Sequence, residues 1–300
     1  MKKLTFESRY LNPLTDFGFH KLFGTESCKE LLIDFLNEII SEEGLITDIQ
    51  YLQPEQWGHL KSDRRAIFDI FCKNEKGEYF IVEMQKAKQT YFRDRSIYYA
   101  SLPIQKQAPR GDWNFQLKAV YMVAVLDFVL FNEFEDDKNR VIEYIRLWRE
   151  QTQTRYSKKL NFIFVELPKF RKTAEELETN RDKWLFTLKN LSQLEERPVS
   201  VQGKVFEELF RIAEIKQLTK EDMREYRKSI LKYRDVRDAM ECARGEAFEE
   251  GIEKGKKEAR EEEKISIIQK CLQKNMTIED IIFFTGFSQE QVTLFTNKQL

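Results

Sequence analysis

The chain has 300 residues, of which 41% are hydrophobic and 34% are charged, so it can bury a sizeable core beneath a charged surface. Its 50 basic and 51 acidic side chains give a net charge of −1, which excludes a uniformly basic nucleic-acid-binding surface but allows a local basic patch. The four cysteines form no CxxC pair and there are two histidines, so we expect no zinc site. No apolar run has the length of a signal peptide or a membrane span, and we expect a soluble protein of the reducing cytoplasm, without a membrane partner.

Two helices are expected near the start of the chain. Residues 12–24, NPLTDFGFHKLFG, predict a loop that leads into a short helix. Residues 28–41 predict a longer helix that ends at Gly44, because apolar residues recur at helical spacing. These apolar residues are Leu31, Leu32, Phe35, Leu36, Ile39 and Ile40.

A β-hairpin and further strands are expected next. Residues 66–73 and 79–85 predict two strands joined by the turn NEKGE, in which Gly77 is free to adopt a positive φ. A helix is expected from residue 90 to about residue 106. Residues 117–127 are apolar throughout, as in a central strand buried on both faces, and VIEYIRLWRE and LNFIFVEL predict two more strands.

Beyond residue 172 the sequence changes to amphipathic helices and then to a charged arm. We divide the chain into residues 1–170, an α/β domain; 171–240, a helical extension; 241–264, a charged helical arm or linker; and 265–300, a small helical tail. The arm repeats glycine among Glu, Lys and Ala, which predicts a solvated helix of low stability.

Two capping boxes are expected in the tail, Thr277 with Asp280 and Ser288 with Gln291. The tail superficially resembles a helix-turn-helix, but its second helix has no arginine to read bases. We therefore favour a packing or oligomerisation module, and a homo-oligomer formed through the C-terminal helices is a possible partner arrangement.

The hairpin carries polar groups among apolar neighbours. Asp69 falls in its first predicted strand, and Glu83 and Gln85 fall in the second. Residues i and i+2 of a strand share a face, so Glu83 and Gln85 point the same way and Lys86 lies on the other face. A turn at residues 76–77 brings Asp69 across from Glu83 or Gln85.

Two carboxylates held at close range repel each other, and their burial is costly without a compensating cation or hydrogen bonds. A hard divalent cation meets this need, because Mg²⁺ or Mn²⁺ prefers one or two carboxylates together with water and phosphate oxygens. The bland alternative is that Asp69 and Glu83 are ordinary surface groups of the hairpin. Their apolar neighbours, such as Ile70, Phe71 and Val82, weigh against that alternative.

These residues resemble the PD-(D/E)XK nuclease superfamily, and most closely its branch of recombination-promoting nucleases, also described as transposases. Five segments of this branch occur here in order between residues 12 and 131. They are TDFGFHKLFG, the helix LLIDFLNEII, the strand ending in ExQ, the helix containing RSIYYAS and the strand VYMVAVLDFVLF. The Gly/Glu/Lys arm also suits this branch.

The resemblance implies an α/β fold with a restriction-endonuclease-like core: a mixed sheet of about four strands flanked by helices and followed by a helical C-terminal extension. It implies metal-dependent cleavage of DNA, with Mg²⁺ or Mn²⁺ as the cofactor and Asp69 and Glu83 as metal ligands. Gln85 takes the place of the superfamily's catalytic lysine; an amide can orient a water but is no proton donor of lysine's kind. Asp16 matches the N-terminal acid of the branch and is an auxiliary candidate. Lys88 is another, if the strand ends before it.

Weaker candidates surround these residues. Lys21 could approach a phosphate, although an ordinary surface position is as plausible. Arg93, Arg95 and Tyr98 of the predicted helix combine cations with an aromatic ring, as suits a DNA backbone, and are DNA-binding candidates. Arg64 is another, because it lies just before the Asp69 strand, where a phosphate contact and a plain solvated loop are equally plausible.

The leading hypothesis is a cytoplasmic, Mg²⁺-dependent DNA endonuclease that hydrolyses phosphodiester bonds and is linked to recombination or a mobile element. The first alternative is a catalytically weak DNA-binding or assembly protein on a nuclease scaffold, which the near-neutral charge and Gln85 support. A second alternative is a helical interaction protein built on the C-terminal arm.

Overall fold

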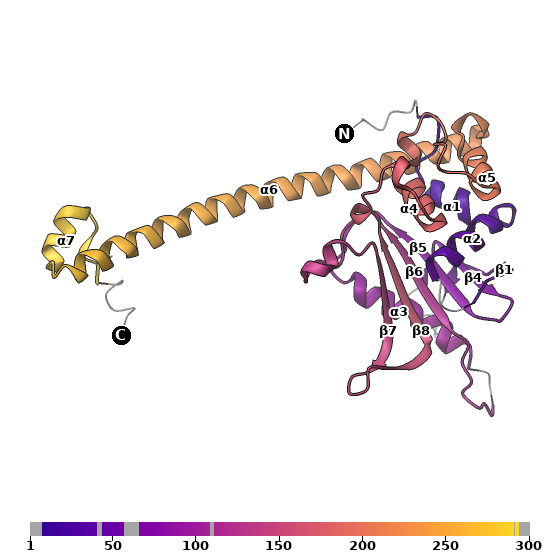
Figure 1. The fold of residues 1–300 in the computed structure, drawn as a ribbon, viewed down its shortest axis with the longest axis horizontal. Helices are drawn as coiled ribbons and strands as arrows, with labels where there is room; N and C mark the ends of the chain where they lie inside the picture. The colour runs from indigo at the N-terminus through magenta and orange to yellow at the C-terminus, as the bar shows by residue number, and fades with distance from the viewer. Residues whose placement is uncertain (1–7, 41–43, 57–65, 109–110, 291, 294–300) are drawn as a thin grey trace. The chain divides into compact units, whose positions relative to one another are not determined.

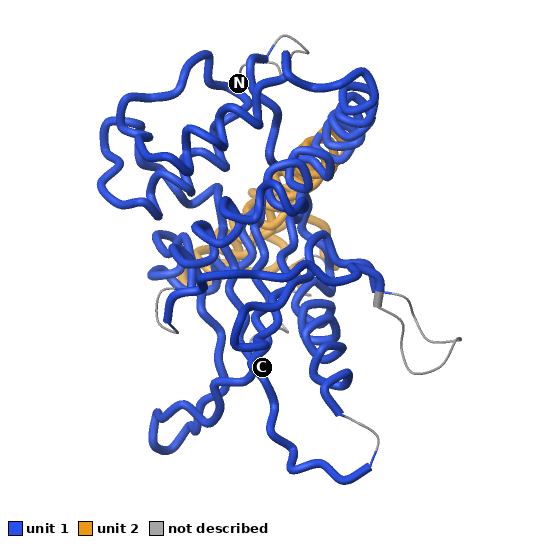
Figure 2. The backbone as a smooth tube through the Cα atoms, turned by 90° about the vertical axis from the view of Figure 1, so that its right-hand side faces the viewer, with its two compact units in different colours: residues 1–237 blue, residues 238–300 orange. Residues whose placement is uncertain are grey.

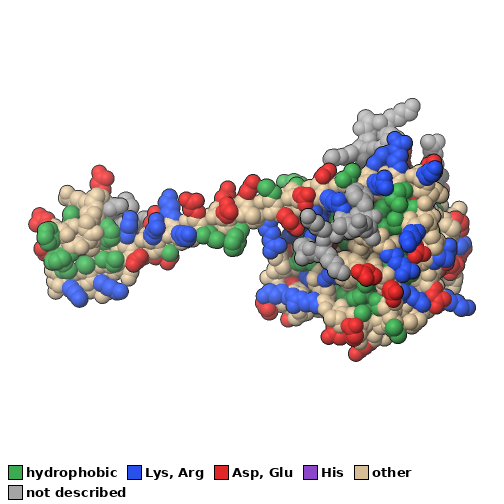
Figure 3. Space-filling model, turned by 90° about the horizontal axis from the view of Figure 1, so that it is seen from above, with side chains coloured by type: hydrophobic (Ala, Val, Ile, Leu, Met, Phe, Trp, Pro, Cys, Tyr) green, Lys and Arg blue, Asp and Glu red, His purple; other side chains and the backbone are tan. Residues whose placement is uncertain are grey.

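A six-stranded mixed sheet organises the first of the two compact units of the chain, residues 1–237, and residues 238–300 form the second (Figure 2). The computed structural model describes residues 8–40, 44–56, 66–108, 111–290 and 292–293. Basic and acidic side chains are interspersed over the surface in view (Figure 3), as the near-zero net charge leads us to expect. None of the helices in these described ranges is long and apolar enough to cross a membrane.

The sheet has the strand order β1-β4-β5-β6-β8-β7 (Figure 1). The strands β5, β6 and β8 run parallel, and the remaining neighbours are antiparallel. A separate two-stranded sheet pairs β2 with β3. The strand bounds are β1 Ile49–Tyr51, β2 Glu55–Gln56, β3 Ala66–Ile67, β4 Ile70–Asn74, β5 Tyr79–Gln85, β6 Val120–Leu126, β7 Ile142–Arg149 and β8 Thr154–Glu166.

The expectation of about four strands is wrong, since the main sheet has six. The strand β1 has three residues, which is too short for alternation to be visible in the sequence, and it forms only through its pairing with β4. At the opposite edge, β7 pairs with the long strand β8. The centre of the sheet agrees with the expectation, because all seven residues of β6 are buried.

Helices cover both faces of the sheet (Figure 1). One core lies between the sheet and the helices α1, α2, α4, α5 and the start of α6, and a second core lies under α3. The α-helices are α1 Asp16–Phe23, α2 Lys29–Ile40, α3 Phe92–Lys106, α4 Asn180–Asn190, α5 Lys204–Ala213, α6 Lys220–Gln273 and α7 Ile278–Thr285. Short 3-10 helices occupy Glu26–Cys28, Glu135–Lys138, Leu167–Lys169, Ala174–Glu176, Leu191–Gln193 and Ile215–Gln217.

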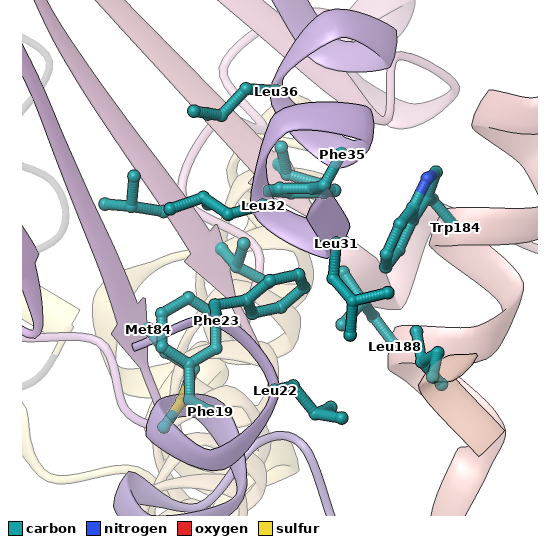
Figure 4. Close-up of a cluster of buried hydrophobic side chains, with 14 of the residues drawn as sticks. Phe19, Leu22, Phe23, Leu31, Leu32, Phe35, Leu36, Met84, Trp184 and Leu188 are labelled. Atoms are coloured by element: carbon teal, nitrogen blue, oxygen red, sulfur yellow. The ribbon is translucent and has the colours of Figure 1, made fainter. Parts of the chain in front are cut away.

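Trp184 of α4 is the largest fully buried side chain of the first core. Its ring lies 5.5 Å from the ring of Phe35 and 5.2 Å from that of Phe206, measured between centroids. Its indole N–H donates to the Asp34 carboxylate at 2.6 Å, so the polar atom of the ring is satisfied. Figure 4 shows Trp184 beside the α2 residues that the helical spacing places on the apolar face.

The first turns of α6 pack on the sheet unit through three hydroxyl groups. The hydroxyl of Tyr226 accepts a hydrogen bond from the Asn12 backbone N–H at 2.8 Å, and that of Ser229 accepts one from the N–H of Phe17 at 3.1 Å. The Tyr233 hydroxyl donates to the Asp127 carboxylate at 2.6 Å. The first two bonds fix the start of α6 beside the beginning of α1, and the third fixes it beside the residue that follows β6.

The hairpin turn and the first capping box near the C-terminus form as expected. Gly77 adopts a φ of +77° between β4 and β5. In the second unit the Thr277 side chain accepts from the Asp280 N–H at 3.1 Å, which confirms the first capping box, whereas Gln291 of the second lies outside the described residues. Residues 238–263 of α6 are all exposed, which agrees with a solvated charged arm.

Replacing Trp184 by alanine should lower the free energy of unfolding by about 3–5 kcal/mol, because the change leaves a cavity in the first core and removes the partner of Asp34. Guanidinium denaturation followed by circular dichroism measures this loss. Trp148→Ala is the matched control, because that ring is 53% exposed and its removal should cost less than about 0.5 kcal/mol. Equal losses in the two variants would contradict this account of the core.

Candidate active site

Asp69 lies at the point where the first strand of the hairpin breaks. The expected strand 66–73 forms as two pieces, because β3 turns away to pair with β2, and β4 begins only at Ile70. Asp69 occupies the bend between them rather than a strand position. The register of the hairpin, Ile70 opposite Val82, makes Asp69 the neighbour of the end of β5.

Asp69 and the end of β5 exchange hydrogen bonds through side chains. The Asp69 backbone N–H donates to Oε1 of Glu83 at 3.2 Å, and the Met84 N–H donates to Oδ2 of Asp69 at 2.8 Å. The amide Nε2 of Gln85 donates to Oε2 of Glu83 at 2.9 Å. The structure therefore brings together the three residues on which the sequence argument depends.

Glu83 is nearly buried, with 3% of its surface exposed. Burial, followed by the negative charge of Asp69, raises the pKa of Glu83 to about 8; hydrogen bonds and the Arg95 guanidinium only partly oppose this. Asp69 is exposed at the surface, but surrounding protein atoms reduce the hydration of its carboxylate and raise its pKa as well. Both carboxyl groups therefore hold a proton more tightly than a free carboxyl group does.

Arg95 of α3 forms an ion pair with the Glu83 side chain on this face. One guanidinium nitrogen lies 3.8 Å from Oε2 of Glu83, and another donates to the side-chain oxygen of Gln89 at 2.6 Å. The guanidinium carbon also lies 5.3 Å from the centroid of the Tyr99 ring. This DNA-binding candidate therefore lies at the acid pair.

A second group of charges meets the same strand end from the opposite face. The Lys86 ammonium lies 2.6 Å from Oδ1 of Asp16, the first residue of α1, and the Lys86 side chain is 9% exposed. The Lys232 ammonium of α6 lies 2.9 Å from Oδ2 of Asp16. Burial acts to raise the pKa of Asp16, but the hydrogen bonds from the two lysines outweigh it and lower the pKa overall. The charges of Asp16 and Lys86 both act on Asp69.

Sequence reasoning missed Lys86 and Lys232 as members of this group. Alternation places Lys86 on the face opposite to Glu83, but β5 ends at Gln85 and Asp16 approaches from that side. The signal for Lys86 was its position directly after the strand end. Lys232 carries no local signal, because it meets Asp16 only through the packing of α6.

The other candidates lie further from the acid pair or make different contacts. Lys21 pairs with Asp222 of α6 at 2.8 Å, and Arg93 pairs with Glu133 at 2.5 Å. Lys88 is exposed and, with Arg93, lines a pocket of about 330 Å³. Tyr98 is partly exposed and lines a larger pocket with Arg95. Arg64 lies outside the described residues.

The acid pair suits a metal that needs few protein ligands. In the part of the chain that the structure describes, no group of three or more His, Cys, Asp or Glu side chains could hold a metal ion. Two carboxylates are nevertheless a sufficient protein contribution for Mg²⁺ or Mn²⁺, which retain water and take phosphate oxygens. Burial and the nearby charge of Asp69 disfavour the ionised form of Glu83, and a bound cation would favour that form. The donor set of Asp69 and Glu83 therefore fits a hard divalent cation.

Comparison with protein families gives a match over residues 13–243, to the PD-(D/E)XK nuclease family transposases. Searches among curated proteins and among solved structures gave no significant match. The matched segment is more than half of the chain and runs from the residues before α1 into α6, so it contains Asp69, Glu83 and both lysines of the second charge group. The chain therefore belongs to the PD-(D/E)XK nuclease family transposases.

Proposed function

We propose that this protein is a divalent-metal-dependent DNA endonuclease that hydrolyses phosphodiester bonds. In this proposal Asp69 and Glu83 are the metal ligands of its active site. The observation that carries the proposal is the nearly buried Glu83 carboxyl, held against Asp69 at the end of a core strand. A structural role does not require two acids there, whereas a cation and a phosphate would use both. Membership of a nuclease family supports the reaction class, and the description of that family as transposases supports a proposed link to recombination or a mobile element.

Asp69 and Glu83 would hold Mg²⁺ or Mn²⁺ together with water and substrate phosphate oxygens. When bound, the ion supplies stabilisation of the charge that develops on the phosphate and a lowered pKa of a bound water. Gln85 fixes Oε2 of Glu83 through its amide N–H, and its side-chain oxygen remains able to accept a hydrogen bond from a water. Gln85 is therefore a positioning residue in this proposal.

Lys86 would supply the positive charge that Gln85 lacks. Its ammonium is held at the strand end by Asp16, within the electrostatic reach of Asp69. Asp16 is fixed in turn by Lys232, so the helices α1 and α6 orient this cation. A lysine placed there can stabilise negative charge or deliver a proton to a leaving oxygen.

Asp69→Asn and Glu83→Gln should each lower the rate of plasmid nicking at least about 100-fold, because each removes a ligand of the proposed ion. The measurement is nicking of supercoiled plasmid with Mg²⁺, with Mn²⁺ and with EDTA, and EDTA should abolish it. Glu150→Gln, in the exposed β7–β8 turn, should leave the rate unchanged.

Equal nicking by the wild-type protein and the Asp69 variant would contradict the site. Tight, salt-dependent DNA binding without any nicking would favour the alternative of a catalytically weak DNA-binding protein on a nuclease scaffold.

Lys86→Met should slow single-turnover cleavage at least about tenfold, since it removes the cation held by Asp16. Lys88→Met is the matched control, because Lys88 is exposed two residues further on and should have a small effect. A larger effect at Lys88 than at Lys86 would assign the role to Lys88 instead. Thermal unfolding of both variants tests whether the loss is one of stability.

The metal-free protein should lose stability as the pH rises from about 4.5 to about 8. The folded state holds the Glu83 pKa near 8, above the ordinary value of 4.5, so it binds the proton more tightly than the unfolded chain does. This contribution is complete below pH 4.5 and is lost as the pH passes through 8, with a slope of about 1 kcal/mol per pH unit. Denaturation of wild type and Glu83→Gln at several pH values measures the slope, which should be smaller in the variant because the contribution of Glu83 is removed. Identical pH profiles would contradict the shift.

A further inference from the structure

A pocket of about 850 Å³ lies along α3 next to the acid pair. Its described lining residues come from the start of α3 and the segment before it: Gln89, Thr90, Tyr91, Asp94, Arg95, Tyr98 and Tyr99. A volume of this order falls within the range of small-ligand sites and is sufficient for a nucleotide. The pocket adjoins the acids through Arg95, which lines it and also lies 3.8 Å from Oε2 of Glu83.

Three of the seven described lining residues are tyrosines. Tyr91 is 73% exposed and Tyr98 is 39% exposed, although large aromatic side chains are mostly buried in folded proteins. Tyr91 directly precedes α3, and Arg95 and Tyr98 follow it at spacings of four and three residues. Arg95 and Tyr98 therefore share a side of the helix, and Tyr91 lies at its N-terminal end. Tyr99 also lines the pocket, but its ring packs against the core, with its centroid 5.1 Å from that of the buried Phe68 ring. The accessible rings are therefore those of Tyr91 and Tyr98.

The charges of the pocket favour a base over a phosphate. The Asp94 carboxylate would repel a phosphate, but it can accept hydrogen bonds from the amino groups of bases. The Arg95 guanidinium already faces the Glu83 carboxylate and the Gln89 side-chain oxygen. The pocket thus presents to a nucleic acid two aromatic rings and a carboxylate that can accept hydrogen bonds. It lies on the same side of the acid pair as α3.

We infer that Tyr91 and Tyr98 bind an unpaired nucleobase of the DNA strand whose phosphate lies at Asp69 and Glu83. In a regular duplex both faces of each base are covered by stacking, so a tyrosine can stack only on a base that has left the helix or was never paired. The substrate class is DNA with an unpaired nucleotide next to the scissile phosphate, as in a single strand or a gapped duplex. This inference rests on the proposed nuclease function, whose substrate it narrows.

The test compares three fluorescein-labelled oligonucleotides of the same sequence: a single strand, a gapped duplex and a perfect duplex. Affinity is measured by anisotropy in EDTA at fixed salt, and cleavage is measured with Mn²⁺. The double variant Tyr91→Ala/Tyr98→Ala removes both rings, and Tyr91→Phe/Tyr98→Phe keeps the rings but loses the hydroxyls. Tyr156→Ala is the control, because this tyrosine of β8 is 73% exposed and does not line the pocket.

The wild-type protein should bind and cut the single strand and the gapped duplex in preference to the perfect duplex. The alanine variant should lose at least about fivefold in affinity for both favoured substrates and little for the perfect duplex, since stacking on one aromatic ring contributes that much or more. The phenylalanine variant and Tyr156→Ala should behave as wild type.

If the alanine variant loses affinity equally for all three substrates, or loses none, the inference is overturned. Cleavage of any of the three substrates that depends on Asp69 would still support the nuclease proposal in that case. Tyrosine-dependent binding of the single strand without cleavage of any substrate would support the nucleobase site and overturn the nuclease.

Discussion

The site depends on the exchange of hydrogen bonds between Asp69 and the end of β5. Backbone N–H groups that a regular ladder would pair with carbonyl oxygens are paired here with carboxylates: Asp69 N–H with Glu83, and Met84 N–H with Asp69. These two hydrogen bonds to carboxylate oxygens hold Asp69 and Glu83 together at the strand end. The bonds are compatible with the break between β3 and β4, because a continuous strand would use these backbone groups in the ladder.

The hairpin alone does not complete the arrangement of charges. Lys86 comes from the strand end, but its partner Asp16 begins α1, and Lys232 lies 216 residues further along the chain than Asp16. The hydroxyls of Tyr226 and Tyr233 hold this part of α6 in place. The first turns of α6 thus pack on the sheet unit and contribute Lys232 to the candidate site, and the family match likewise extends to residue 243.

The sequence pattern predicted those elements whose formation depends on residues close to one another in the chain. The helix α2, the buried strand β6 and the turn at Gly77 follow from periodicity and backbone preference, and the meeting of Glu83 with Asp69 follows from the hairpin they share. The short strand β1, the bend at Asp69 and the contact of Lys232 with Asp16 depend on tertiary pairing. No window of sequence around those residues contains that information.

The apolar residues that make the hairpin predictable also bury Glu83, and burial of its carboxyl group destabilises the fold. Glu83 occupies a strand position between Val82 and Met84, where an apolar residue would stabilise the fold. Gln85, Arg95 and the Asp69 N–H offset part of the desolvation, and the pKa of about 8 reflects the part that they leave uncompensated. A fold under selection for stability alone would remove this acid, since a neutral side chain would end the repulsion with Asp69. Its presence in a core strand is therefore the strongest physical argument that the pair serves a cation and a substrate.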